Sequence, residues 1–127
     1  MPVEYEIKVE PEDIDYHGNC MASGDDAVDR ETEEWIANEL NRGNDLAWCS
    51  VVVFARFEDF EGIDSLGGCS YKSMTDLEEN LIPEMKKNAL ASLKAHMQRA
   101  IEFSVRDAKE HVKTARKALK ALEKEEG

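Results

Sequence analysis

Residues 46–57, with the sequence LAWCSVVVFARF, decide the fold of this chain. Their centre, residues 51–54, reads Val-Val-Val-Phe, so a strand built from it is apolar on both faces. A strand of this kind usually lies inside a sheet and is covered on both sides. We therefore expect residues 46–57 to form the central strand of a sheet, with packed structure on each face.

Two further patterns predict the neighbouring strands. In residues 3–9 apolar side chains alternate with Glu and Lys, which is typical of a strand with one buried and one solvated face, and Pro11 ends the pattern. A third strand is predicted near residues 65–71, after a short polar turn. Gly67 and Gly68 within it indicate a β-bulge or a close approach of another backbone.

A helix is predicted over residues 28–41, where apolar residues recur with a period of 3.6. The apolar positions are Val28, Trp35, Ile36 and Leu40, and we expect the last three to pack. Asp25 or Asp26 would cap the N-terminus, and Gly43 would end the helix. A further helical turn is predicted at the capping-box sequence Thr-Asp-Leu-Glu of residues 75–78.

The C-terminal part of the chain predicts one long helix. Residues 84–123 contain neither Gly nor Pro, and Pro83 suits the first turn of a helix. At about 1.5 Å per residue this helix would be about 60 Å long, whereas a domain of this size has a radius of gyration of about 14 Å. We expect its first part to pack through Leu90, Leu93 and Met97, and its far half to kink or to need a partner.

These elements predict a single α+β domain of 127 residues in the order β-α-β-β-α. It would contain a three-stranded, mostly antiparallel sheet, one packed helix and the long C-terminal helix. Charge divides the chain into two parts. Residues 1–80, the acidic body, hold 21 Asp and Glu against 5 Lys and Arg, a net charge of −16. Residues 81–127 hold 7 Asp and Glu against 11 Lys and Arg, a net charge of +4.

The overall net charge of −12 limits the partners of the chain. Negative charge repels nucleic-acid backbones, so direct nucleic-acid binding is disfavoured and a basic protein partner is favoured. No run of about 18 apolar residues occurs, so we expect no membrane-spanning helix. The N-terminal residues lack the pattern of a signal peptide, and we expect a cytoplasmic protein with reduced cysteines.

The far half of the long helix carries a heptad pattern typical of a coiled coil. Its apolar residues recur at alternating spacings of four and three, and they are Ile101, Val105, Ala108, Val112, Ala115, Leu119 and Leu122. The small alanines would allow close packing of two helices. We expect these residues to form the interface of a homodimer. In the alternative interpretation, the same residues fold back on the sheet as ordinary core.

A second set of residues is a candidate site for a small ligand. His17, Asn19, Asp25 and Cys69 would line a cleft between the loop of residues 17–26 and the turn at Gly67 and Gly68. This alternative makes the protein a small-ligand binder or an enzyme. The sequence offers no nucleophile paired with a base and no strong metal-ligand spacing. We therefore predict no catalytic residue, metal or cofactor.

The cysteines leave three alternatives open. His17, Cys20, Cys49 and Cys69 have the composition of a structural zinc site, but only His17 and Cys20 have local ligand spacing. Cysteine is also among the most often buried residue types, and we expect buried thiols. A reactive thiol at Cys69 would need a nearby base, and its sequence neighbours supply none.

Four short motifs stand within residues 3–95. They are Gly18-Asn19, Ser23-Gly24-Asp25, Ala47-Trp48 and Leu66-Gly67-Gly68-Cys69-Ser70-Tyr71. In these motifs the chain resembles a class of small acidic proteins encoded in phage and prophage genomes. That class has no assigned activity, so the resemblance implies an origin, in which case the host cytoplasm is the expected location. It carries over no catalytic residue.

Together these observations predict a non-enzymatic interaction protein. If the chain is phage-encoded, we expect an accessory or inhibitor protein that docks on a basic host or defence protein. A further alternative is a nucleic-acid mimic, in which carboxylates of helix 28–41 and strand 3–9 stand in for phosphates.

Overall fold

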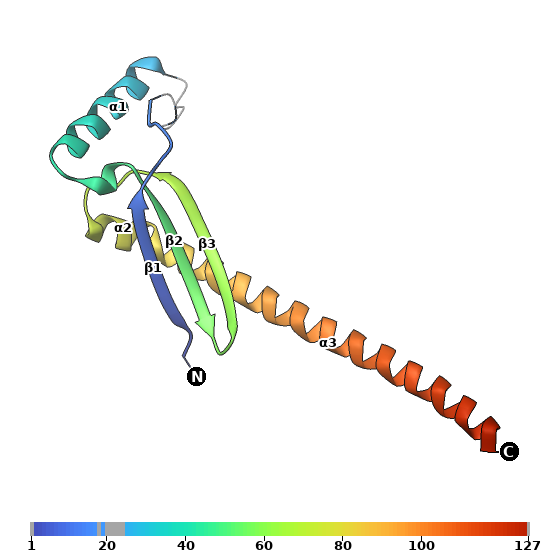
Figure 1. Ribbon diagram of the computed structural model, residues 1–127. Helices are drawn as coiled ribbons and strands as arrows, with labels where there is room; N and C mark the ends of the chain where they lie inside the picture. Colours follow the sequence, from blue (N-terminus) through green and yellow to red (C-terminus); the bar gives the residue numbers. More distant parts are fainter. Residues whose placement is uncertain (1, 18, 20–24, 127) are drawn as a thin grey trace. The chain divides into compact units, whose positions relative to one another are not determined.

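The computed structural model describes residues 2–17, 19 and 25–126 (Figure 1). The elements are β1 (Glu4–Pro11), α1 (Asp26–Asn41), the 3-10 helix η1 (Asp45–Ala47), β2 (Cys49–Phe57), β3 (Phe60–Cys69), α2 (Met74–Asn80) and α3 (Ile82–Glu126). The strands form one antiparallel sheet in the order β1-β2-β3. The predicted α+β class and the central position of the Val-Val-Val-Phe strand are thus confirmed.

The chain divides into two compact units, residues 1–93 and residues 94–127. The first unit contains the sheet, α1, α2 and the first turns of α3. The second unit consists of the remainder of α3.

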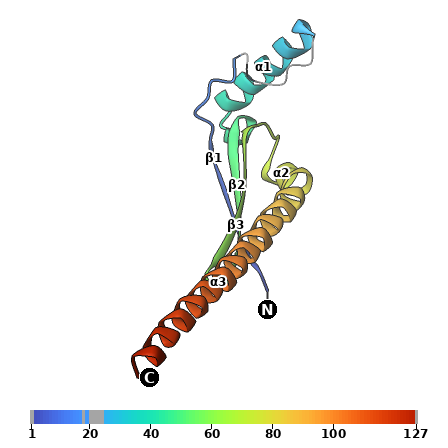
Figure 2. The same cartoon turned by 90° about the vertical axis from the view of Figure 1, so that its right-hand side faces the viewer.

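The core of the first unit lies on one face of the sheet. Alternate residues of β2 are buried there: Cys49, Val51, Val53 and Ala55. Leu77 of α2 and the start of α3 cover this face (Figure 2). The buried residues of α3 are Ile82, Met85, Ala89 and Leu93. Of the three residues expected to pack, Leu93 is buried as predicted, whereas Leu90 and Met97 are only partly buried. The packed face is centred on Met85 and Ala89 instead.

The other face of the sheet is not covered by a second layer in the described part of the chain. Val52 and Phe54 lie on this face and are only partly buried, so the expectation that β2 is covered on both sides is wrong. Long cationic side chains take the place of the missing layer. The Nζ atom of Lys8 lies 5.3 Å, and the guanidinium carbon of Arg56 lies 4.7 Å, from the centre of the Phe54 ring.

Helix α1 packs on the segment that precedes β2 and not on the face of the sheet. Ile36 is buried with Ala47 and Trp48, and Trp35 and Leu40 pack against this cluster. The predicted packing of α1 through Trp35, Ile36 and Leu40 is confirmed. The surface on which α1 packs differs from expectation. Residues 45–47 form a 3-10 helix instead of extending the strand, and α1 packs on this segment.

The ends of the elements follow local capping chemistry. Asp25 accepts a hydrogen bond from the N–H of Ala27 at 2.9 Å, and Gly43 follows the end of α1 with φ of 91°. Ser73 caps α2 by accepting from the N–H of Asp76 at 3.2 Å. The predicted cap at residue 75 is thus two positions too late, because the hydroxyl of Ser73 already accepts a hydrogen bond from the first turn of α2.

Candidate interaction surfaces and the predicted ligand site

The distal stripe of α3 is the largest set of exposed apolar side chains in the second unit. We use this name for the seven predicted interface residues, Ile101, Val105, Ala108, Val112, Ala115, Leu119 and Leu122. The chain is helical throughout this range, and all seven residues are exposed. The five large side chains among them are 46 to 63 % exposed. Stripes of this kind on soluble proteins usually mark a surface that another molecule covers.

The distal stripe contains a shallow groove with a basic wall. Val105, Ala108 and Val112 form the apolar side of this groove. The basic residues that line this groove are Lys109, Lys113, Arg116, Lys117 and Lys120. Phe103 is also exposed, but it lies nine residues before Val112, which places it on the opposite side of the helix. The apolar stripe therefore has one defined face.

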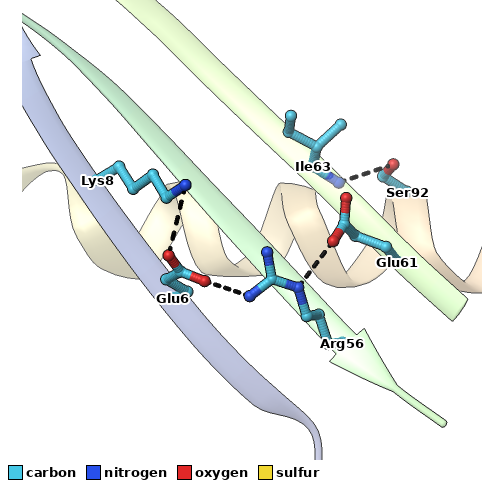
Figure 3. Close-up of polar contacts among 6 residues, drawn as sticks. All are labelled: Glu6, Lys8, Arg56, Glu61, Ile63 and Ser92. Atoms are coloured by element: carbon cyan, nitrogen blue, oxygen red, sulfur yellow. Dashed lines mark hydrogen bonds and ion pairs between the residues drawn. The ribbon is translucent and has the colours of Figure 1, made fainter. Parts of the chain in front are cut away.

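The open face of the sheet carries a network of charged side chains in the acidic body (Figure 3). Arg56 of β2 contacts Glu6 of β1 through one guanidinium nitrogen and donates through Nε to Glu61 of β3 at 2.7 Å. Lys8 approaches Glu6 at 3.6 Å. The hydrogen bond from Arg56 is the main reason why the pKa of the Glu6 carboxyl lies below its ordinary value. The network ties all three strands together on the solvent side.

The predicted ligand residues make their contacts with different neighbours. His17 stacks on Tyr16 and lies 3.8 Å from a carboxylate oxygen of Glu33. The amide of Asn19 donates to the carbonyl of Asp15 at 2.8 Å. Asp25 caps α1, as described above. These three residues serve local turns and the start of a helix, which is the role that their residue types commonly have in loops.

Cys69 lies at a β-bulge in β3, as the two glycines predict. Cys49 pairs with Cys69 and Val51 pairs with Leu66, so Gly67 and Gly68 together oppose Ser50. Gly68 has φ of 64° and donates its N–H to the carboxylate of Glu12 at 2.8 Å. The positive φ explains why glycine stands at this position.

A recess of about 290 Å³ opens beside this bulge. Its lining consists of Thr32, Ile36, Trp48, Leu66, Gly67, Gly68, Cys69, Ser70 and Tyr71. Only Cys69 of the four predicted ligand residues belongs to it. Sequence reasoning missed Thr32 and Trp48 because they come from elements that are far from β3 in the sequence. Gly67 and Gly68 were the one local sequence feature that pointed to the bulge beside this recess.

Cys49 of β2 and Cys69 of β3 are paired residues, and both are buried. Their thiols donate to different carbonyls, that of Cys49 to Leu46 and that of Cys69 to Leu66. Burial is the main cause that raises the pKa of Cys49 from 9.0 to about 11, and the neighbouring Cys69 and Glu12 add to it. Burial, followed by Glu12, also raises the pKa of Cys69. These surroundings favour neutral thiols over nucleophilic thiolates.

Cys20, the fourth member of the predicted zinc set, lies outside the described residues. Within the residues that the structure describes, no cluster of three or more His, Cys, Asp or Glu side chains is placed to hold a metal ion. Nor does any described helix combine the length and apolar character needed to cross a membrane.

Comparisons with protein-family models, with curated proteins and with solved structures gave no match to this chain.

Proposed function

We propose that this protein is a non-enzymatic interaction protein that forms a homodimer through the distal stripe of α3 and binds a basic partner protein with its acidic body. The observation that carries the proposal is the exposure of five large apolar side chains on one face of an uninterrupted helix. An isolated helix is marginally stable in water, and pairing two such faces would bury both stripes in one step.

The charge of the acidic body supports the second half of the proposal. A net charge of −16 over residues 1–80 attracts basic surfaces over distances of about 8 to 10 Å at ordinary ionic strength. The resemblance to phage-encoded proteins extends the proposal to a basic host or defence protein as the partner.

Self-association is tested by light scattering coupled to size-exclusion chromatography at tens of micromolar protein. We expect the intact chain to have the mass of a dimer. Val112→Glu should give a monomer, because it places a charge at the centre of the distal stripe. The matched control is Phe103→Glu, which removes a more exposed apolar side chain (68 % against 46 % for Val112) from the opposite side of the helix and should leave the dimer intact.

A shortened chain that ends at residue 99 should also be monomeric. A monomeric mass for the intact chain, or a dimer that persists in both Val112→Glu and the shortened chain, would contradict the proposed interface.

A further inference from the structure

The two outer edges of the sheet differ in how their backbone groups are satisfied. β1 and β3 are the edge strands. At the β3 edge, the N–H of Ile63 donates to the hydroxyl of Ser92 in α3 at 3.2 Å (Figure 3). This hydrogen bond occupies an outward-facing donor of β3. The β1 edge is therefore the side of the sheet to consider as a template for another strand.

The direction of the Ile63 N–H shows which backbone groups of β1 point outward, because these directions alternate regularly in an antiparallel sheet. Ile63 pairs with Phe54, but the N–H of Ile63 points away from β2 towards Ser92. The pair is therefore one without hydrogen bonds between the strands, and the N–H and C=O of Phe54 point to the other side, towards Glu6 of β1. Because the direction alternates along a strand, Tyr5, Ile7 and Val9 present their N–H and C=O groups at the outer edge of β1, where no other described strand pairs with them. The N–H of Glu12 donates to the carbonyl of Trp48 at 3.3 Å, which continues the same alternation.

An apolar groove runs beside this free edge, on the helix side of the sheet. It is lined by Ile7, Val9, Met74, Leu77, Glu78 and Ile82, and its volume is about 370 Å³. The groove is open to solvent, since Ile7 is 39 % exposed and Met74 is 46 % exposed. A side chain entering from a strand laid along β1 would thus find an apolar surface.

The charges around the β1 edge are mostly negative. On the open face of β1 stand Glu4, Glu6 and Glu10 with one cation, Lys8, and Arg56 of β2 contacts Glu6. On the helix side, the Nζ atom of Lys86 lies 5.3 Å from the centre of the Tyr5 ring. At the rim of the groove stands Glu78. Opposite charges on neighbouring strands stabilise their pairing, and like charges destabilise it. A strand with basic residues on one face fits this edge.

We propose that an extended segment of alternating apolar and basic residues binds to β1 as a fourth strand. Its backbone would pair with Tyr5, Ile7 and Val9, its apolar side chains would enter the groove, and its Lys or Arg residues would lie beside Glu4, Glu6 and Glu10. The inference rests on the proposed function, whose partner is a basic protein, and it assigns that partner a place and a binding mode.

A second copy of this chain fits the same edge less well. When two β1 strands pair antiparallel about Ile7, each Glu6 meets Lys8 of the other copy, but each Glu4 meets Glu10. The attractive and repulsive pairs are equal in number. A basic strand gains an attractive neighbour at Glu4 and at Glu10, whereas Glu6 is already paired with Arg56 and Lys8. The charges therefore favour a foreign strand.

The test uses the intact chain and a labelled peptide, Lys-Val-Lys-Val-Lys-Val-Lys, in a fluorescence anisotropy titration. The control peptide, Val-Val-Lys-Lys-Lys-Lys-Val, has the same composition without the alternation. We expect the alternating peptide to bind about tenfold more tightly, one peptide per chain, with an affinity that falls as salt is added.

Two variants locate the binding. Ile7→Pro removes an outward-facing N–H while the hydrogen bonds between β1 and β2 are kept, and Met74→Lys places a positive charge in the groove. Each should weaken binding of the alternating peptide about tenfold or more. Circular dichroism checks the fold of both, and Met74→Lys, at an exposed position, carries the test if Ile7→Pro does not fold.

The outcomes separate this inference from the proposed function. The β1 site would be overturned if both peptides bound equally well, or if the alternating peptide bound equally to the parent chain, Ile7→Pro and Met74→Lys. Either result would still be compatible with a basic partner that binds elsewhere on the acidic body. A dimeric mass that is lost in Ile7→Pro would show that a second copy occupies the edge and would also overturn the inference. If neither peptide binds at low salt, the basic partner itself is refuted, while self-association through α3 is judged by its own experiment.

Discussion

Gly62 of β3 and Leu93 of α3 approach so closely that a Cβ atom on Gly62 would stand 2.2 Å from the backbone nitrogen of Leu93. The same atom would stand 2.2 Å from the carbonyl oxygen of Ala89. Any side chain at position 62 would therefore push the helix away from the sheet. The absence of a side chain at Gly62 sets the distance between α3 and β3, next to the hydrogen bond between Ser92 and Ile63.

Gly62→Ala should consequently destabilise the protein by about 3 kcal/mol or more, because the obstructing atoms belong to the backbone and cannot turn aside. Urea unfolding followed by circular dichroism measures the effect. Ser65→Ala is the matched control, since Ser65 lies on the same strand and is exposed, and it should change the free energy of unfolding only slightly. A Gly62→Ala protein as stable as the parent would contradict the close packing of α3 on β3.

Ile36→Ala should cost about 2–4 kcal/mol, because Ile36 of α1 is fully buried in a cluster with Ala47 and Trp48 and its truncation leaves a cavity. The matched control on the same helix is Val28→Ala, at a position that is 46 % exposed, and its effect should be close to zero. Thermal unfolding of the two variants distinguishes them. Equal effects would mean that α1 is not held by this cluster.

The thiols of Cys49 and Cys69 should react slowly with Ellman's reagent in a Cys20→Ser variant. At pH 8 we expect modification of Cys49 to be on the order of 100-fold slower than that of free cysteine, because burial raises its pKa to about 11. The rate should increase as the pH rises towards that value. In urea both thiols should react at the rate of an unfolded chain. Rapid reaction of the folded protein at pH 8 would contradict the buried positions.

The same raised pKa makes the stability depend on pH. The folded state favours the neutral thiol of Cys49, so this stabilisation is present below the ordinary value of 9.0 and is lost as the pH rises towards about 11. The free energy of unfolding should therefore decrease over this interval. A Cys49→Ala variant, measured over the same pH range, should show a smaller decrease.

Much of the candidate interaction surface was predictable from the sequence. The heptad spacing between Ile101 and Leu122 and the absence of Gly and Pro define both the helix and its apolar face. For the grouping of His17, Asn19, Asp25 and Cys69, by contrast, the sequence offers only loop composition as a reason. In the structure Cys69 lines a recess together with Thr32 and Trp48, and no local pattern links these residues.

The sequence by itself determined the main elements and their order, because the periods of two and 3.6, the capping side chains and the glycines act between residues close in the chain. The ends were less well determined: the third strand was predicted near residues 65–71, whereas β3 spans Phe60–Cys69, and the 3-10 helix η1 was not predicted. Only the tertiary structure decided which surfaces are covered. Val52 and Phe54 are as apolar as Val51 and Val53, yet helices cover only the face with Val51 and Val53. On the opposite face, the side chains of Lys8 and Arg56 lie over the ring of Phe54. The close packing of α3 on Gly62 and the position of β1 at the edge of the sheet likewise depend on contacts between residues far apart in the sequence. A pattern within a short stretch of sequence does not predict such contacts.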